Sequence, residues 1–197
     1  MSDLVAWSGG MDSTLCLFDM AVRYPQKMIT AITVTGIGFS ETQRRAEAKA
    51  RKRIKQEFKK RKINNIVYYD ININNNLRKE SHQMKLWLSY IIPCLENKDI
   101  LHMSYLSSDG VDFFENKNNM KRAFSSMMKF RGIKAELNFP YEYWTKGNVI
   151  RDLKKAKLTR FVNYCGEPRK DLKPCGKCMK CMSVKRWTKY GKSGKPT

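Results

Sequence analysis

The chain lacks any long run of apolar residues, and its mean hydropathy is −0.59, which argues against a membrane-spanning protein. Residues 1–7 contain no basic leader followed by a cleavable apolar stretch, so we expect a cytoplasmic rather than a secreted protein. A hydrophobic content of 42% over 197 residues is nevertheless sufficient for a core, and it excludes a disordered chain.

Acidic residues are scarce, since 18 Asp and Glu stand against 39 Lys and Arg and leave a net charge of +21. The positive electrostatic field of a protein with this net charge attracts polyanions, among them nucleotides and nucleic acids. Eleven basic side chains fall between positions 44 and 62, where the acidic residues are Glu47 and Glu57. We interpret this helix either as the solvated face of a lysine-rich protein or as a nucleic-acid contact, to which the basic, aromatic residues 185–190 would add. No membrane partner is expected.

Apolar runs alternate with segments of helical periodicity over the first 140 residues. Strands are predicted at 3–7, 28–34, 65–70 and 99–103, and helices at 13–24, 41–62, 82–95 and 148–156. This alternation is typical of an α/β protein with a parallel sheet and helices on both faces. We predict a nucleotide-binding domain over residues 1–140 and a C-terminal region over 141–197 that holds most of the cysteines.

A glycine-containing loop follows the first predicted strand, with the sequence Ser8-Gly9-Gly10-Met11-Asp12-Ser13-Thr14. Adjacent glycines let the backbone approach a ligand closely, and the N-terminus of the following helix favours an anion. The lysine of a Walker A loop is absent, so that class is excluded. The alternative is a serine-capped helix after a glycine turn.

Four of the six cysteines are Cys165, Cys175, Cys178 and Cys181, and the last three follow the pattern C-x-x-C-x-x-C. In a reduced compartment this spacing favours a metal over disulfides, and four thiolates would close a structural zinc site. A reactive thiol pair and an iron–sulfur cluster are the alternatives. Cys16 and Cys94 are expected to be small buried hydrophobic residues.

The segment from Ser8 to Ser13 resembles the S-G-G-x-D-S signature of the PP-loop ATP pyrophosphatases, which have the adenine nucleotide α-hydrolase-like fold. The resemblance implies cleavage of ATP between its α and β phosphates to leave an adenylated substrate. It also implies an ATP site formed by this loop, with Asp12 at the accompanying Mg²⁺ and the second strand's end near the adenine or ribose. The implied ATP-binding residues are Ser8, Gly9, Gly10, Met11, Asp12, Ser13, Thr14, Val34 and Thr35.

Such a loop followed by C-G-x-C-x-x-C is similar to the QueC family, the 7-cyano-7-deazaguanine (preQ0) synthases. Gln43 and Glu47 lie where that family has a glutamine and a nearby acid. The resemblance implies catalytic roles for Asp12, Asp109 and Lys146, with Lys146 as the cation for the phosphates. The implied substrates are 7-carboxy-7-deazaguanine, ammonia and ATP, with AMP and pyrophosphate released, in a homodimer.

The sequence departs from that family at several positions. Arg45 replaces a histidine, Ser104 replaces a glycine, and the Y-P-D-C-R stretch, which in that family helps define the deazaguanine pocket, has no counterpart. Two other functions therefore remain open. One is a PP-loop enzyme that adenylates a base within tRNA or DNA, and the other is a non-catalytic, basic, zinc-containing nucleic-acid-binding protein.

Overall fold

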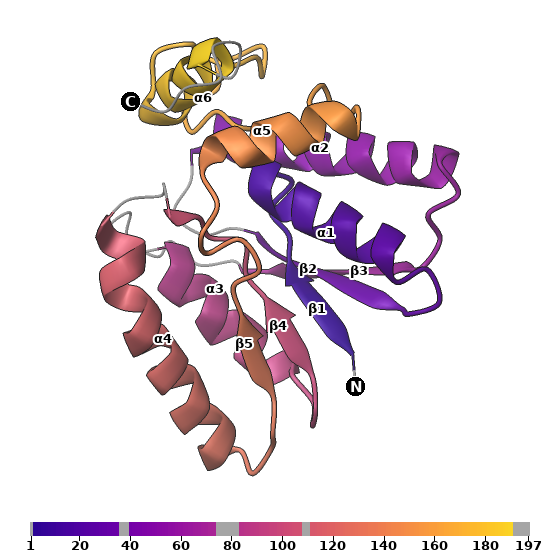
Figure 1. The fold of residues 1–197 in the computed structure, drawn as a ribbon, viewed down its shortest axis with the longest axis vertical. Helices are drawn as coiled ribbons and strands as arrows, with labels where there is room; N and C mark the ends of the chain where they lie inside the picture. Colours follow the sequence, from indigo (N-terminus) through magenta and orange to yellow (C-terminus); the bar gives the residue numbers. More distant parts are fainter. Residues whose placement is uncertain (1, 36–39, 74–82, 108–110, 191–197) are drawn as a thin grey trace.

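The computed structural model describes residues 2–35, 40–73, 83–107 and 111–190, and it confirms the α/β class. Five strands form one sheet in the order β3-β2-β1-β4-β5, and every neighbouring pair is parallel (Figure 1). The strands are β1 (Asp3–Ala6), β2 (Ile29–Thr35), β3 (Ile66–Asn72), β4 (Ile100–His102) and β5 (Glu136–Asn138).

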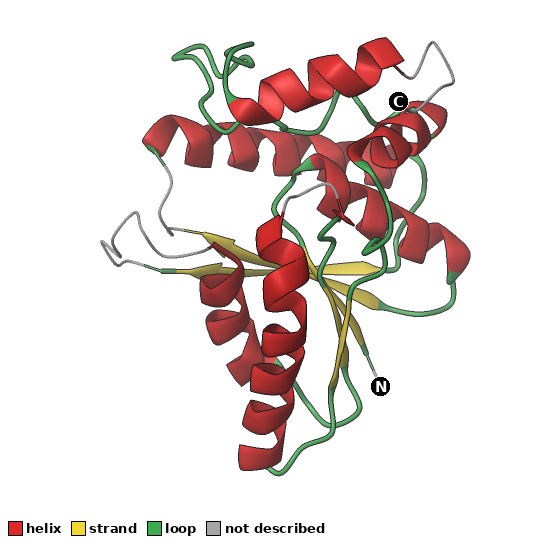
Figure 2. Ribbon diagram, turned by 60° about the vertical axis from the view of Figure 1, so that its left-hand side comes forward, coloured by secondary structure: helices red, strands yellow, loops and turns green. Residues whose placement is uncertain are grey.

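Helices cover both faces of the sheet, as the two views in Figures 1 and 2 show. Because successive residues of a strand point to opposite faces of the sheet, β1 contributes side chains to two hydrophobic cores. Leu4 and Ala6 pack with the helices α3 (Gln83–Ile91) and α4 (Val111–Phe130). The short helix η1 (Ile92–Cys94), which follows α3, belongs to the same cluster. Val5 packs instead with α1 (Met11–Arg23), α2 (Glu41–Lys60) and α5 (Lys146–Lys155).

The predicted strands and helices are confirmed to within a few residues, but three elements were not predicted. These are α4, β5 and α6 (Met179–Tyr190). Among the described side chains of α4, only Met120, Phe124 and Met128 are buried. Met127 and Phe130 are exposed, so the apolar residues of α4 are not confined to one face, which weakens the helical periodicity and explains why the helix was missed.

The C-terminal region packs directly against the first helix and its strand. Val149, Ile150 and Leu153 of α5 are buried in the same cluster as Val5 and Leu15. Residues 141–190 therefore complete one face of the sheet. None of the helices within the described ranges combines the length and apolar character needed to cross a bilayer.

A buried polar network lies beneath this face. The Asp3 carboxylate contacts Lys27 and accepts a hydrogen bond from His102 Nε2 at 2.8 Å, and His102 Nδ1 lies 3.1 Å from the Asn138 amide. Burial alone would raise the pKa of Asp3, but the bonds from Lys27 and His102 outweigh it and lower that pKa. Burial lowers the pKa of His102, so its ring is neutral near pH 7. These contacts indicate a structural role for His102.

The network predicts a loss of stability on acidification. Between pH 7 and pH 5 an unfolded histidine gains a proton near its ordinary pKa of about 6.5, whereas native His102 resists protonation, so stability falls as the pH falls. Asp3 stays ionised through this window because its pKa is lowered.

His102→Gln removes the titration and keeps a donor for Asp3. We expect urea unfolding at a series of pH values to show a shallower decline for this variant than for the unaltered chain. Equal slopes for the two proteins would contradict the assignment.

Candidate active site and metal centre

The candidate site lies where the sheet topology reverses direction. The strand β1 sits between β2 and β4, so the chain leaves β1 toward one side and later returns on the other. In open α/β sheets such a switch point forms a crevice at the carboxyl ends of the strands, where ligands bind. The loop of residues 8–10 follows β1 directly at this point.

Trp7 fixes the start of the loop. Its amide donates to the Ile32 carbonyl at 2.8 Å, and its carbonyl accepts from the Thr33 hydroxyl at 2.7 Å. The indole Nε1 donates to the Thr14 hydroxyl at 3.2 Å, and both side chains are fully buried. These bonds hold the end of β1 and the first turn of α1 in one arrangement.

The two serines of the signature contact each other across the turn. The Ser8 and Ser13 hydroxyls lie 3.2 Å apart, and Ser13 Oγ also accepts from the Ser8 amide at 3.2 Å. Ser8 Oγ accepts from the Gly10 amide at 3.1 Å. Hydrogen bonds from its own side chains therefore close the turn.

Gly9 occupies a position that demands glycine. Its φ of +83° lies in the left-handed region, and a Cβ there would lie 2.8 Å from Arg51 Cγ and 3.2 Å from the Glu47 carbonyl oxygen. The guanidinium of Arg51 donates to the Ser8 carbonyl at 3.1 Å. Helix α2 is therefore in direct contact with the loop backbone.

A row of polar side chains on α2 faces the loop and is largely shielded from solvent. Gln43, Glu47 and Arg51 follow one another at four-residue intervals, and Gln43 donates to the Glu47 carboxylate at 3.2 Å. Burial raises the pKa of Glu47 and lowers that of Arg51. Arg51 was not identified from the sequence, although its spacing from Glu47 could have indicated it.

The first turn of α1 carries the charged pair of the site. Gly10 caps the helix without a side-chain hydrogen bond, so the first-turn amides suit an anion. Lys146 Nζ donates to both oxygens of the Asp12 carboxylate, at 2.7 and 2.9 Å. Lys146 is the first residue of α5, whose N-terminus is fixed by the Thr145–Asn148 capping box. The fold thus joins two predicted catalytic residues that are 134 positions apart in sequence.

Other predicted residues lie around the same edge. Val34 and Thr35 end β2, where Val34 is buried and the Thr35 hydroxyl donates to the Ile71 carbonyl at 3.3 Å. The Met11 side chain is buried in the core. Asp109 lies outside the described residues.

The four predicted ligand cysteines come together. Their sulfur atoms all lie within 4.8 Å of one another, with separations of 3.5 Å for Cys165–Cys175, 3.8 Å for Cys165–Cys178 and 3.9 Å for Cys175–Cys181. A tetrahedron with zinc–sulfur bonds of about 2.3 Å has edges of about 3.8 Å, so the arrangement fits a tetrahedral metal ion. Backbone amides also point at the sulfurs, among them that of Cys178 toward Cys175 at 3.3 Å.

The cysteine cluster is attached to the loop by Asn163, a residue that the sequence did not single out. The Asn163 amide donates to the Gly9 carbonyl at 3.0 Å, and residues Gly10 and Asn163 form a parallel bridge. The Asn163 side chain bonds the backbone of Cys165 in both directions, at 3.2 and 3.3 Å. One residue therefore connects the metal centre to the candidate phosphate loop.

Of the two remaining cysteines, Cys16 is buried as predicted, whereas Cys94 is only partly buried. Cys16 lies on α1 and is buried in the hydrophobic core, and burial raises the pKa of its thiol to about 12. Cys94 is half-buried at η1, and burial raises its pKa as well. Neither belongs to the metal cluster found among the described residues.

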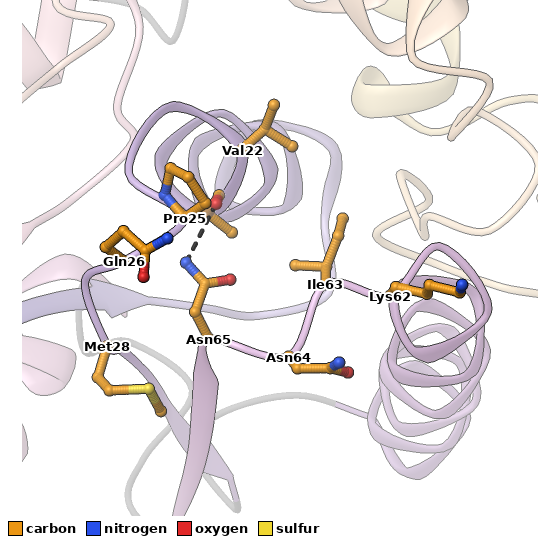
Figure 3. Close-up of a pocket in the computed structure, with 9 residues that line it drawn as sticks. Val22, Pro25, Gln26, Met28, Lys62, Ile63, Asn64 and Asn65 are labelled. Atoms are coloured by element: carbon orange, nitrogen blue, oxygen red, sulfur yellow. Dashed lines mark hydrogen bonds between the residues drawn. The ribbon is translucent and has the colours of Figure 1, made fainter.

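An open hollow of about 440 Å³ lies at the far end of α1, away from the loop (Figure 3). Asn65 stands at its centre and donates to the carbonyls of Ala21, Tyr24 and Lys27 at 3.0–3.1 Å. These bonds satisfy backbone carbonyls at and after the end of α1, which gives Asn65 a structural role.

No protein-family model matches this chain, and no curated protein matches it either.

The Gly9 geometry predicts a severe effect of Gly9→Ala. The left-handed conformation costs about 1 kcal/mol for alanine, and crowding against α2 adds roughly 1–3 kcal/mol. Gly132→Ala is the matched control, because Gly132 has a φ of +67° but nothing within 4 Å of its added Cβ. Denaturant unfolding should show a clearly larger drop in stability for Gly9→Ala, and equal drops would contradict the close approach of α2.

The cysteine geometry predicts about one zinc ion per chain. Cys178→Ser should lower the bound zinc and destabilise residues 163–181, whereas Cys94→Ser should leave the zinc content unchanged. Elemental analysis of the purified proteins measures both. Full zinc in Cys178→Ser, or the visible absorbance of an iron–sulfur cluster, would be inconsistent with the assignment.

Proposed function

We propose that the chain is an ATP-dependent enzyme of the PP-loop class that adenylates a carboxylate and releases AMP and pyrophosphate. The Asp12–Lys146 pair carries this proposal, because it places an acid and a cation at the start of α1, within the Ser8–Ser13 signature. The all-parallel sheet, with this loop at its switch point, is consistent with the adenine nucleotide α-hydrolase-like fold.

The loop and its neighbours offer the groups that a triphosphate requires. The first-turn amides of α1 and the hydroxyls of Ser8 and Ser13 would bind pyrophosphate oxygens. Asp12 would hold Mg²⁺, which neutralises phosphate charge when bound. Lys146 would then exchange its bond to Asp12 for bonds to the phosphates.

The preferred substrate is 7-carboxy-7-deazaguanine, with the nitrile preQ0 as product. Hydroxide is a poor leaving group, so transfer of AMP to the carboxylate with loss of pyrophosphate activates the carbon. Ammonia then displaces AMP to give the amide. Adenylation of the amide oxygen by a second ATP, followed by loss of AMP and a proton, leaves the nitrile. Positive charge from Lys146 would stabilise the departing pyrophosphate.

The zinc would have a structural role. Four thiolates fill the coordination shell and leave no open position for a substrate. Because Asn163 joins Cys165 to Gly9, a folded metal centre would keep the loop in its binding conformation.

A direct assay combines the protein with Mg-ATP and ammonium, with and without 7-carboxy-7-deazaguanine, and follows the products by mass spectrometry. Release of AMP that requires 7-carboxy-7-deazaguanine, together with formation of the nitrile, would establish the activity. The amide alone would indicate an enzyme that stops after the first adenylation. An absence of AMP with this acid would reject it as the substrate.

Asp12→Asn should reduce AMP release by about 100-fold or more, because the variant loses the charge that holds the metal. Asp152→Asn is the matched control, since Asp152 lies on α5 and pairs with Arg151 and Lys155 away from the loop. Circular dichroism should show both variants folded. Turnover retained in Asp12→Asn would refute the mechanism.

A further inference from the structure

The net charge of the chain is concentrated in two segments. Residues 41–62 contain eleven basic and three acidic side chains, and residues 141–197 contain sixteen and four. The rest of the chain is almost neutral, with twelve basic and eleven acidic residues. A general preference for lysine would have spread the charge over the whole chain.

The fold brings residues 41–62 and the described part of the second segment, residues 141–190, together at one end of the molecule. Arg61, which follows α2, donates to the Ala156 carbonyl at 2.6 Å, and Arg53 donates to the Arg160 carbonyl at 2.6 Å. Helices α2, α5 and α6 gather at the top of Figure 1, whereas α3 and α4 extend away from them. The basic segments therefore form one surface, which we call the α2–α5 basic surface.

Most cations on α2 are not neutralised by acidic side chains of the protein. In the C-terminal segment, by contrast, ion pairs to acids occur at Lys146, Arg151, Lys155, Arg169 and Lys173. Within the described part of α2, half-buried Lys55 pairs with Asp70, and the exposed cations of this helix make no ion pair with an acid. These exposed α2 cations are Arg44, Arg45, Lys49, Lys52, Arg53, Lys59 and Lys60. Crowding of like charges destabilises the folded state, so this concentration indicates an anionic partner rather than a contribution to stability.

Arginines on the surface are held in place by an aromatic ring. The guanidinium groups of Arg53 and Arg160 lie 5.6 and 4.8 Å from the centre of the Phe161 ring. Stacking on a ring fixes the plane of a guanidinium and leaves donors free to bind phosphate oxygens. The surface also continues to the candidate site, because Arg51 of the same helix contacts Ser8.

We propose that the α2–α5 basic surface binds the phosphodiester backbone of a nucleic acid, which would then pass beside the phosphate loop. Helix α2 has 20 residues and is about 30 Å long, which matches roughly nine phosphates of one strand. The proposal does not depend on the adenylation chemistry, since binding is measured without ATP.

The test is fluorescence anisotropy with labelled RNA and DNA of about 20 nucleotides, single-stranded and duplex, between about 50 and 200 mM KCl. A test variant combines Lys49→Gln, Lys60→Gln and Lys157→Gln on the surface. The matched control combines Arg122→Gln, Lys129→Gln and Lys134→Gln, which removes the same charge from the α4 end. All six side chains are exposed, so both variants should fold normally by circular dichroism.

The unaltered protein should bind at least one of these nucleic acids with a strong salt dependence. The test variant should bind about 10–100-fold more weakly at the lowest salt. Its salt slope should fall by about 2–3, because each phosphate that is no longer neutralised lowers the slope by close to one. The control should keep nearly the original slope. No binding at about 50 mM KCl, equal weakening in both variants, or equal affinity for polyglutamate would overturn the proposal.

Discussion

The structure depends on the turn that joins β1 to α1, where the backbone is packed too closely for any side chain at Gly9. Arg51 of α2 approaches this turn from one side, and Asn163 binds its carbonyl from the C-terminal region. Both contacts require the sheet face to be complete, because α2 and α5 belong to the same core cluster as α1. The close approach of the backbone therefore links the first strand, the basic helix and the cysteine cluster in one assembly.

Charged side chains occupy two different environments in this protein. Inside the described part of the fold, charged groups have defined partners, as in the contacts of Asp3 with Lys27 and His102 and the pairing of Asp12 with Lys146. Unpaired buried charges would cost too much free energy to persist. On the α2–α5 basic surface, by contrast, the cations face solvent. The same helix shows both patterns, since Glu47 and Arg51 are half-buried on one side and Lys49 and Lys52 are exposed on the other.

Several features could be predicted from the sequence because their signals are local. Apolar runs such as residues 28–34 indicated the strands, and the two glycines after the first strand indicated the loop. The spacing of Cys175, Cys178 and Cys181 predicted a cluster that the structure confirms. Helix α4 was missed because exposed apolar residues such as Met127 and Phe130 obscure the spacing of its described buried side chains, Met120, Phe124 and Met128.

By itself, the sequence determined the α/β class, the position of the loop and the identity of the four clustered cysteines, since each follows from residues that are close together in the chain. Only the tertiary structure decided which distant residues meet. Lys146 reaches Asp12 because α5 packs against α1, and Asn163 reaches Gly9 because the chain returns past the end of β1. Such contacts result from the packing of whole helices against a shared sheet, and no local pattern of residue types contains that information.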